Sequence, residues 1–221
     1  MIIDCISDLH GDFPKLGQGD LLIVAGDLTG RDKKEEYFEF FQWASNQCYK
    51  KIVVIGGNHD TFLQETGCPL VNLGIFSYLC DSGTEFLGIK IWGTPWTKTF
   101  PGMNPRCKAF TKDTDEELLE RYSNIPNDID ILVSHNPPYG ILDGVHRLSR
   151  RKEDGDEHVG SKSLANIVLS RERLPNLKLH VFGHIHRHGG QMIEDGGVKF
   201  VNAAIMDEVY DPVNKPVRII L

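Results

Sequence analysis

One short segment of the sequence most constrains the fold. Residues 52–55 are all β-branched and predict a strand buried on both faces. Residues 56–57 are both glycine and predict a sharp turn, because glycine lets the backbone bend and approach a ligand closely. The turn would present Asn58, His59 and Asp60 at the carboxyl end of the strand, where open α/β sheets bind ligands. Taken alone, the segment is equally compatible with an ordinary polar turn.

The same pattern, an apolar run that ends in Asp, Asn or His, occurs four more times in the chain. The runs are 2–6, 20–25, 129–133 and 177–182, and the polar residues after them are Asp8, His10, Asp27, His135, Asn136, His184 and His186. Within the pairs 8/10 and 184/186, both side chains can face one point on an extended segment. Each motif alone is weak, since a solvated turn has the same composition. Five motifs in this order favour a single site.

Between these runs, the pattern is that of an α/β fold. Residues 33–47 predict an amphipathic helix with Tyr37, Phe38, Phe41 and Ala44 on its apolar face. This helix would connect two parallel strands by a right-handed crossover. We also expect helices at 61–66, 115–122 and 160–173, hairpins at 78–93 and 190–202, and a final strand at 217–221. Residues 143–158 are rich in charge and predict a solvated loop.

Length and composition limit the possible functions. The 221 residues suffice for one domain with a sizeable core, and 40% apolar with 25% charged residues is typical of a soluble globular protein. The net charge of −7 argues against an extended nucleic-acid surface, but not against a small phosphate substrate beside bound cations. Five cysteines without a CxxC pair predict reduced thiols and a cytoplasmic location. We expect no signal peptide and no membrane-spanning segment.

The polar residues at the strand ends have the chemistry of a metal centre. Carboxylate oxygens and imidazole nitrogens are ligands for ions such as zinc, manganese and iron. The collected set is Asp8, His10, Asp27, Asn58, His59, His135, His184 and His186. Even seven of these exceed what one ion needs from a protein. We therefore expect two divalent ions that share a carboxylate, roughly 3.5–4 Å apart, as is usual for phosphoester hydrolysis.

The five motifs resemble those of the calcineurin-like metallophosphoesterase superfamily. The matching stretches are Asp8-x-His10, Gly26-Asp27, Gly57-Asn58-His59-Asp60, His135 and Gly183-His184-x-His186. Residues 92–96, 179–186 and 201–216 are also similar to the fetal-brain type cyclic nucleotide phosphodiesterases of this superfamily, which contain a metallophosphoesterase domain. The resemblance covers almost the whole chain. It implies a single metallophosphoesterase domain over residues 1–221, folded as a four-layer αββα sandwich of two mixed β-sheets flanked by helices.

The resemblance also implies a role for each residue of the centre. One metal ion would be bound by Asp8, His10 and His186, and the other by Asn58, His135 and His184. Asp27 would bridge the two ions, and a hydroxide between them would attack phosphorus. His59 would act as the acid that protonates the leaving oxygen. Manganese is the expected ion in vitro, with iron, zinc, nickel, cobalt and magnesium as alternatives.

The implied substrate is a small phosphodiester, in particular a cyclic nucleotide. Candidate substrate contacts are Asn58, His59, Asn136, Gly160 and Ser161, and Trp96 or Tyr139 could supply an apolar wall for a base. The amides at 160–161 would open a helix and so could bind an anion. Asn136, where the family tends to have glycine, and the long 143–158 loop with Arg147, Arg150 and Arg151 set this chain apart on the substrate side.

Other functions stay open at this point. A phosphomonoesterase or protein phosphatase, a nuclease, and a dinucleoside polyphosphate hydrolase are alternatives among enzymes of this fold. A scaffold without catalysis is a further alternative, but such scaffolds have lost the acid or the ligands, and all are present here. We expect His180 to be structural because it lies within a strand, and Asn202 to support the site or cap backbone groups. The sequence leaves the oligomeric state, monomer or dimer, open.

Overall fold

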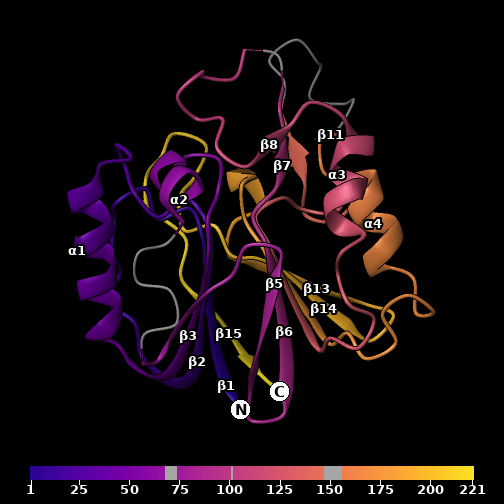
Figure 1. Cartoon of the computed structure of the whole chain (residues 1–221), viewed down its shortest axis with the longest axis horizontal. Helices are drawn as coiled ribbons and strands as arrows, with labels where there is room; N and C mark the ends of the chain where they lie inside the picture. The colour runs from indigo at the N-terminus through magenta and orange to yellow at the C-terminus, as the bar shows by residue number, and fades with distance from the viewer. Residues whose placement is uncertain (68–73, 101, 147–155) are drawn as a thin grey trace.

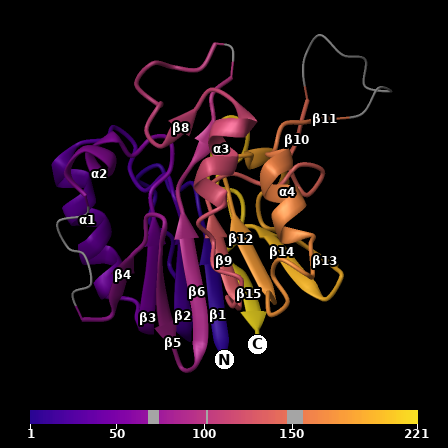
Figure 2. The same cartoon turned by 45° about the vertical axis from the view of Figure 1, so that its right-hand side comes forward.

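Two β-sheets pack against each other, and helices cover their outer faces (Figures 1 and 2). The computed structural model describes residues 1–67, 74–100, 102–146 and 156–221. Helices α1 (Lys34–Ser45) and α2 (Thr61–Thr66) lie on the side of the first sheet, and α3 (Asp115–Tyr122) and α4 (Lys162–Val168) lie on the side of the second. This is the four-layer αββα sandwich of two mixed sheets that the resemblance implied.

The first sheet has five strands in the order β15-β1-β2-β3-β4. They are β1 (Ile2–Ile6), β2 (Gln18–Ala25), β3 (Cys48–Ile55), β4 (Phe76–Tyr78) and β15 (Val217–Ile220). Strands β1 to β4 pair in parallel, and β15 pairs antiparallel to β1 with Ile219 opposite Ile3. The predicted β-α-β unit is therefore present, with β2 and β3 beginning earlier than the apolar runs.

The second sheet has six strands in the order β13-β14-β12-β9-β6-β5. They are β5 (Ser82–Phe86), β6 (Ile89–Thr94), β9 (Ile131–Ser134), β12 (Leu179–Phe182), β13 (Gln191–Asp195) and β14 (Val198–Asn202). The four inner strands are parallel, and the edge strands β5 and β13 are antiparallel to their neighbours. The 190–202 hairpin is confirmed. The 78–93 hairpin is shorter than predicted, because residue 78 pairs with β3 in the other sheet.

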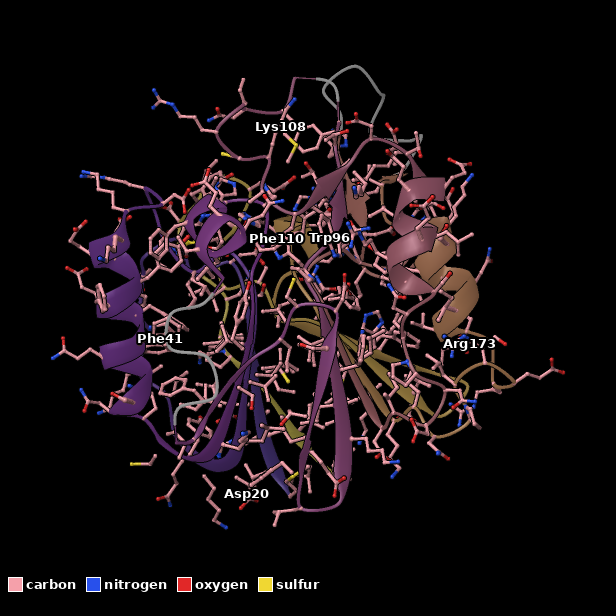
Figure 3. The ribbon with its side chains drawn as sticks, viewed as in Figure 1. Asp20, Phe41, Trp96, Lys108, Phe110 and Arg173 are labelled. Atoms are coloured by element: carbon pink, nitrogen blue, oxygen red, sulfur yellow. The ribbon has the colours of Figure 1, made fainter. Side chains whose placement is uncertain are left out.

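Alternation along the strands divides the core into layers. In β2, Ile23 packs between the sheets, while Leu22 and Val24 belong to the cluster that includes α1. Phe41 of α1 reaches this outer cluster (Figure 3). The predicted helix face was wrong in one position, since Phe38 is 48% exposed and Phe40 is buried instead. Strands that are covered on both faces explain the continuous apolar runs in the sequence.

Two predicted segments differ from the structure. Helix α4 ends near residue 169, because Ser170 begins a turn in which its hydroxyl accepts a hydrogen bond from the Arg173 amide. The ends of the 143–158 segment are ordered as a small ladder of β10 (Gly144–Val145) and β11 (Glu157–His158). Residues 147–155, with the three arginines considered above, lie outside the described residues.

The carboxyl ends of the parallel strands lie together at the edge of the molecule opposite the two termini (Figure 1). Two further short strands, β7 (Thr97–Lys98) and β8 (Thr111–Lys112), pair above this edge, and the 3-10 turn η2 (His186–His188) follows β12. Cys5, Cys48, Cys80 and Cys107 are free thiols. Among the described residues, no helix has the length and apolar character needed to cross a membrane.

Candidate metal centre

The turns after the strands hold the predicted residues in an unusual backbone conformation. Asp8, His10, Asp27 and His184 have φ angles of 54°, 43°, 54° and 67°. Non-glycine residues adopt this left-handed region rarely, and mostly at functional sites. The turns after β1 and β2 also bind each other, since the amides of Asp8 and His10 donate to the carbonyls of Gly26 and Asp27. These hydrogen bonds hold the turn that carries Asp8 and His10 beside the turn that carries Asp27.

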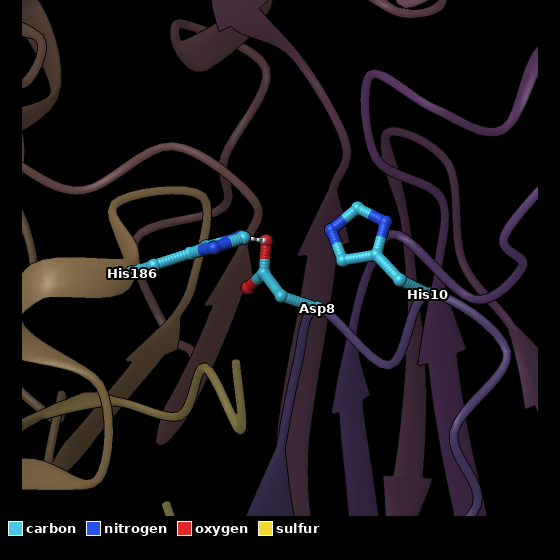
Figure 4. A group of neighbouring side chains, drawn as sticks. All are labelled: Asp8, His10 and His186. Atoms are coloured by element: carbon cyan, nitrogen blue, oxygen red, sulfur yellow. Dashed lines mark ion pairs between the residues drawn. The ribbon is translucent and has the colours of Figure 1, made fainter. Parts of the chain in front are cut away.

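Asp8, His10 and His186 form a first cluster, with their ligand atoms within 4.8 Å of one another. Figure 4 shows the Asp8 carboxylate between the two imidazoles, with His186 Nε2 3.3 Å from Asp8 Oδ1. The His186 ring is oriented because its Nδ1 donates to the carbonyl of Asp207 at 2.8 Å. His10 Nε2 is buried, and no described residue hydrogen-bonds to it. The cluster therefore contains a buried imidazole nitrogen without a hydrogen-bond partner among the described residues.

Asp27 connects this cluster to a second one. The Asp27 carboxylate belongs to two groups of potential metal ligands, one with Asp8 and His135 and one with His10 and His59. His135 Nε2 lies 3.4 Å from Asp27 Oδ2 and 3.0 Å from Asn58 Oδ1. His135 Nδ1 donates to the carbonyl of Ala25, which leaves Nε2 to face the centre. Asp27 thus occupies the middle position that a bridging ligand requires.

His184 completes the second cluster. Its ring centroid is 5.1 Å from that of His135. Its backbone amide donates to both carboxylate oxygens of Asp8, at 3.1 and 2.9 Å. The seven predicted ligands therefore converge from both sheets, as expected of residues at the carboxyl ends of strands.

The electrostatics of the two carboxylates are dominated by their neighbours. Burial would raise the pKa of Asp8, but the hydrogen bond and charge of His186 hold it well below its usual range. Burial likewise opposes ionisation of Asp27, and the charges of His135 and His59 lower its pKa. Both groups are therefore carboxylates at neutral pH, buried to 0% and 2% exposure.

The histidines divide into two kinds. Burial lowers the pKa of His10 to about 4 and that of His184 to about 3, so both imidazoles are neutral. Burial also acts against the charged form of His135, but the Asp27 carboxylate raises its pKa to about 9. The pKa of His186 is raised as well, by its hydrogen bond to Asp8 against the effect of burial. Without an ion, a proton on His135 offsets part of the negative charge of the two carboxylates, and the raised pKa of His186 acts in the same direction.

This donor set fits divalent cations. No lysine or arginine of the described chain forms an ion pair with Asp8 or Asp27, whose only ionic partners are histidines. Buried charges are stable only when they are paired or coordinate a metal. Oxygen and nitrogen donors without sulfur suit zinc, manganese, iron and similar ions. The orphaned nitrogen of His10 and the two close carboxylates are the features that a bound cation would satisfy.

His59 lies at the side of the centre that faces solvent. Its imidazole is 21% exposed, and its Nε2 is 3.9 Å from Asp27 Oδ2. Its ring packs edge-on against His10 with centroids 4.6 Å apart. No hydrogen bond to the His59 imidazole is found among the described residues, and packing against the rings of His10 and Tyr210 positions it.

Asp60 is the main residue whose role the sequence reasoning missed. It is fully buried, and its carboxylate accepts the amides of Asp27, Leu28 and Gly57 and the hydroxyl of Tyr37. Burial and the nearby Asp27 charge raise its pKa. Asp60 therefore ties the turn after β3 to the turn after β2. Its position three residues after Gly57, the spacing of a side-chain capped turn, was the available signal.

A large groove leads away from the centre. It has a volume of about 1420 Å³ and is lined by Asn58 and His59 near the centre and by Phe100, Tyr139 and Lys162 further out. Tyr139 is 39% exposed, so it is available to a ligand.

Trp96, the other candidate for an apolar wall, belongs to the core. It is only 9% exposed, and its ring packs edge-on against Phe110 with centroids 5.7 Å apart (Figure 3). Its Nε1 donates to Asp81. Of the two aromatic walls proposed from the sequence, only Tyr139 faces the groove.

Asn136 lines the groove, and one atom of its side chain is engaged within the protein. Its Oδ1 accepts the Thr97 hydroxyl at 2.9 Å, whereas its Nδ2 is buried without a hydrogen-bond partner among the described residues. The Oδ1 bond connects the end of β9 to β7, which carries the groove residue Lys98. Asn136 therefore supports the groove wall through Oδ1, and its contact with a substrate stays a prediction.

The expected anion site at residues 160–161 is already occupied by the protein. The Gly160 amide donates to Asp143 Oδ2, and the Ser161 amide donates to the carbonyl of Pro137. The Ser161 hydroxyl donates to Asp115 and caps the start of α4. The prediction that these amides face a substrate anion was wrong in geometry, because two aspartates from other segments supply the negative charge.

The two residues considered supporting behave as such. His180 is buried, its Nε2 contacts the Ser134 hydroxyl at 2.8 Å, and burial lowers its pKa to about 3. Asn202 donates to the carbonyls of Leu142 and Ile185. Because Ile185 lies between two predicted ligands, backbone capping by Asn202 also supports the centre.

Comparison with known proteins agrees with this geometry. The chain matches the model of the calcineurin-like phosphoesterases over residues 1–188. It therefore belongs to the calcineurin-like phosphoesterase family. Metallophosphoesterase domain-containing protein 1 from Homo sapiens and its counterpart from Mus musculus are each 34% identical to it over 241 residues, which cover 97% of this chain and 69% of each relative. The subfamily resemblance predicted from the sequence is confirmed.

Solved structures support the fold alone. One superposes with a TM-score of 0.59 at 17% identity, covering 91% of this chain and 89% of its own. Phosphopantetheinyl hydrolase from Mycobacterium tuberculosis superposes with a TM-score of 0.56 at 15% identity, covering 92% and 88%. At these identities, the likeness concerns the arrangement of the sheets.

Proposed function

We propose that this chain is a phosphodiesterase that depends on two divalent metal ions and that accepts cyclic nucleotides. The observation that carries the proposal is the pair of buried carboxylates, Asp8 and Asp27, with histidines as their only ionic partners among the described residues. Membership of a metallophosphoesterase family supports the same chemistry at the level of phosphoester hydrolysis.

The proposed ligands divide as the resemblance implied. Asp8, His10 and His186 would hold one ion, Asn58, His135 and His184 the other, and Asp27 both. When bound, such ions activate water at neutral pH and offset negative charge on the phosphoryl group. We propose manganese as the working ion in vitro, with iron, zinc, nickel, cobalt and magnesium as alternatives, since the donor set contains only nitrogen and oxygen.

His59 is proposed as the general acid. Its ring lines the groove next to Asp27 and is 21% exposed. A departing alkoxide needs a proton, and a positioned imidazole can supply it. Asp27 holds His59 in place through the His59 backbone amide, which donates to Asp27 Oδ1 at 2.9 Å.

The groove favours a diester over a monoester. Space extends from the centre toward Tyr139 and Phe100, so a phosphoryl group at the centre could carry organic groups on two oxygens. Tyr139 offers an apolar face for a nucleobase. The net charge of −7 does not favour long nucleic acids as substrates. A cytoplasmic location remains a prediction from the cysteines.

The deciding experiment is an assay of the metal-reconstituted protein against four substrates. These are a 2′,3′-cyclic nucleotide, a 3′,5′-cyclic nucleotide, an aryl diester and an aryl monoester. We expect the diester to be cleaved faster than the monoester, with at least one cyclic nucleotide consumed and no turnover in chelator. Faster cleavage of the monoester, with both cyclic nucleotides untouched, would favour the phosphomonoesterase or protein phosphatase alternative. No turnover of any substrate would favour a scaffold.

The acid role has its own test, His59→Ala. The variant should retain both metal ions and lose about 10²–10⁴-fold in turnover of a cyclic nucleotide, as is typical when a general acid is removed. The loss should be smaller for an aryl diester, whose leaving group needs no proton. His188→Ala, a histidine that contacts Asp156 outside the centre, is the matched control. Equal losses on good and poor leaving groups would argue against His59 as the acid.

A further inference from the structure

Tyr210 lies over the histidines of the centre. Its ring centroid is 4.8 Å from that of His10, 5.0 Å from His186 and 6.4 Å from His59. The residue comes from the loop after β14, far in sequence from the strand-end motifs. It is 52% exposed and lines the groove. One face of Tyr210 therefore contacts the centre, while the rest of the side chain is open to a ligand.

The loop holds this ring in a fixed place. Asp207 Oδ1 accepts the amides of Val209 and Asp211, each at 2.9 Å, and the Asp207 carbonyl accepts the amide of Tyr210 at 3.1 Å. The same carbonyl of Asp207 accepts His186 Nδ1. One short turn thus orients a predicted ligand and presents the tyrosine beside it.

The backbone of Tyr210 is strained. Its φ angle of 66° lies in the left-handed region, which bulky residues avoid. Such conformations persist where the surrounding structure over-determines them, and they concentrate at ligand sites. Glycine or asparagine would fit this turn with less strain.

We propose that Tyr210 is a specificity-determining residue that contacts the organic group of the substrate. The inference rests on the proposed function and adds the residue that contacts the organic group of the ester. The acid His59 must lie next to the leaving oxygen, and Tyr210 borders both His59 and the groove. An organic group attached to that oxygen, aryl or nucleoside, therefore packs against the Tyr210 ring. Inorganic phosphate carries no such group and gains nothing from the ring.

The test compares two probes on the metal-loaded protein by calorimetry: phenylphosphonate, which is not hydrolysed, and inorganic phosphate. Tyr210→Ala should weaken phenylphosphonate binding on the order of tenfold, the effect expected for lost apolar contact in a pocket. Binding of inorganic phosphate should not change. Tyr210→Phe should bind both probes as the unmodified protein does, because the ring makes the contact. Val209→Ala, at a neighbouring side chain that is 73% exposed, is the control and should change neither.

The outcomes separate this inference from the proposed function. Equal weakening of both probes in Tyr210→Ala, no weakening of either, or a loss in Tyr210→Phe as large as in Tyr210→Ala would overturn the role of the ring. Metal content is measured on each variant, so that damage to the centre through His186 is recognised. If the unmodified metal-loaded protein binds neither probe and cleaves no phosphoester, the proposed function itself fails.

Discussion

Strand β1 and the turn after it bury carboxylates with different partners. Asp4, in the middle of the strand, accepts hydrogen bonds from Arg218 Nε at 2.8 Å and Nη2 at 2.7 Å, and from the Tyr49 hydroxyl. Asp8, just after the end of the strand, faces His186 and the amide of His184. Both residues are at most 3% exposed. One carboxylate is neutralised by a permanent cation of the chain, and the other by an imidazole that can lose its proton.

This difference separates a structural carboxylate from a ligand. Arginine is charged at every accessible pH, so the Asp4 pair is closed to other cations. Histidine gives up its proton near neutrality and then becomes a metal ligand itself. A carboxylate surrounded by histidines can therefore be neutralised by protons on those histidines or, once the protons leave, by a metal ion. The counter-ion, more than burial, reveals which acidic residue has a function.

The largest effect that we predict follows removal of the functional carboxylate, Asp8. Asp8→Asn should lose bound metal and should lower turnover by more than the roughly 10–100-fold that follows loss of an outer partner of a metal site. Metal analysis and the diester assay measure this effect. Asp4→Asn, the matched change on the same strand, should keep both ions and full turnover. Retention of two ions in Asp8→Asn would show that the two carboxylates do not differ as described.

A smaller effect is expected at the structural carboxylate, Asp4. Asp4→Asn should lower the free energy of unfolding by about 2 kcal/mol at neutral pH, through loss of charged hydrogen bonds to a buried group. Burial opposes ionisation of Asp4, but Arg218 and Tyr49 lower its pKa below the ordinary 3.8. The stabilisation is therefore present above pH 3.8 and is lost as the pH falls through the folded pKa. Urea unfolding at neutral and acid pH should show the gap between the proteins closing in acid.

The smallest predicted effect concerns the protons that metal ions displace from the histidines of the centre. At neutral pH the metal-free centre carries a proton on His135, whose pKa is raised to about 9, and the raised pKa of His186 favours a proton there as well. Metal ions must displace these protons, so affinity should rise with pH, about tenfold per unit for each proton released, and the rise due to His135 should level off above about 9. Calorimetry in two buffers of different ionisation enthalpy counts the protons. Affinity that does not vary with pH would contradict the exchange.

The sequence predicted where the polar residues gather because strands carry them. Asp27, Asn58 and His135 lie two or three residues after apolar runs, and parallel strands bring their carboxyl ends to one edge whatever the details of packing. The assignment of these residues to two metal ions came from the family resemblance and stays a prediction. Most strands were predicted from their apolar runs, with errors of a few residues at their ends, whereas the division into two sheets came from the family resemblance.

The remaining parts depend on contacts between distant segments. Tyr210 reaches the centre from a loop whose position is set by Asp207 and His186, and no periodicity announces such a contact. The amides at 160–161 do open a helix, as predicted, but Asp115 and Asp143 arrive from elsewhere in the chain to occupy that position. Local sequence patterns predict which hydrogen-bonding groups a segment exposes. Tertiary packing determines which other groups bind to them.

The left-handed backbone of the centre has an evolutionary consequence. Asp8, His10, Asp27 and His184 each adopt a backbone conformation that is unfavourable for residues other than glycine. Each such conformation lowers the stability of the fold by about 1 kcal/mol. Together these costs are a large part of the roughly 5–15 kcal/mol that a typical protein has as its free energy of unfolding. A descendant that no longer needed the ions would gain stability by glycine replacement at any of these positions. Loss of the centre is thus favoured by folding itself, and each such step makes its recovery harder.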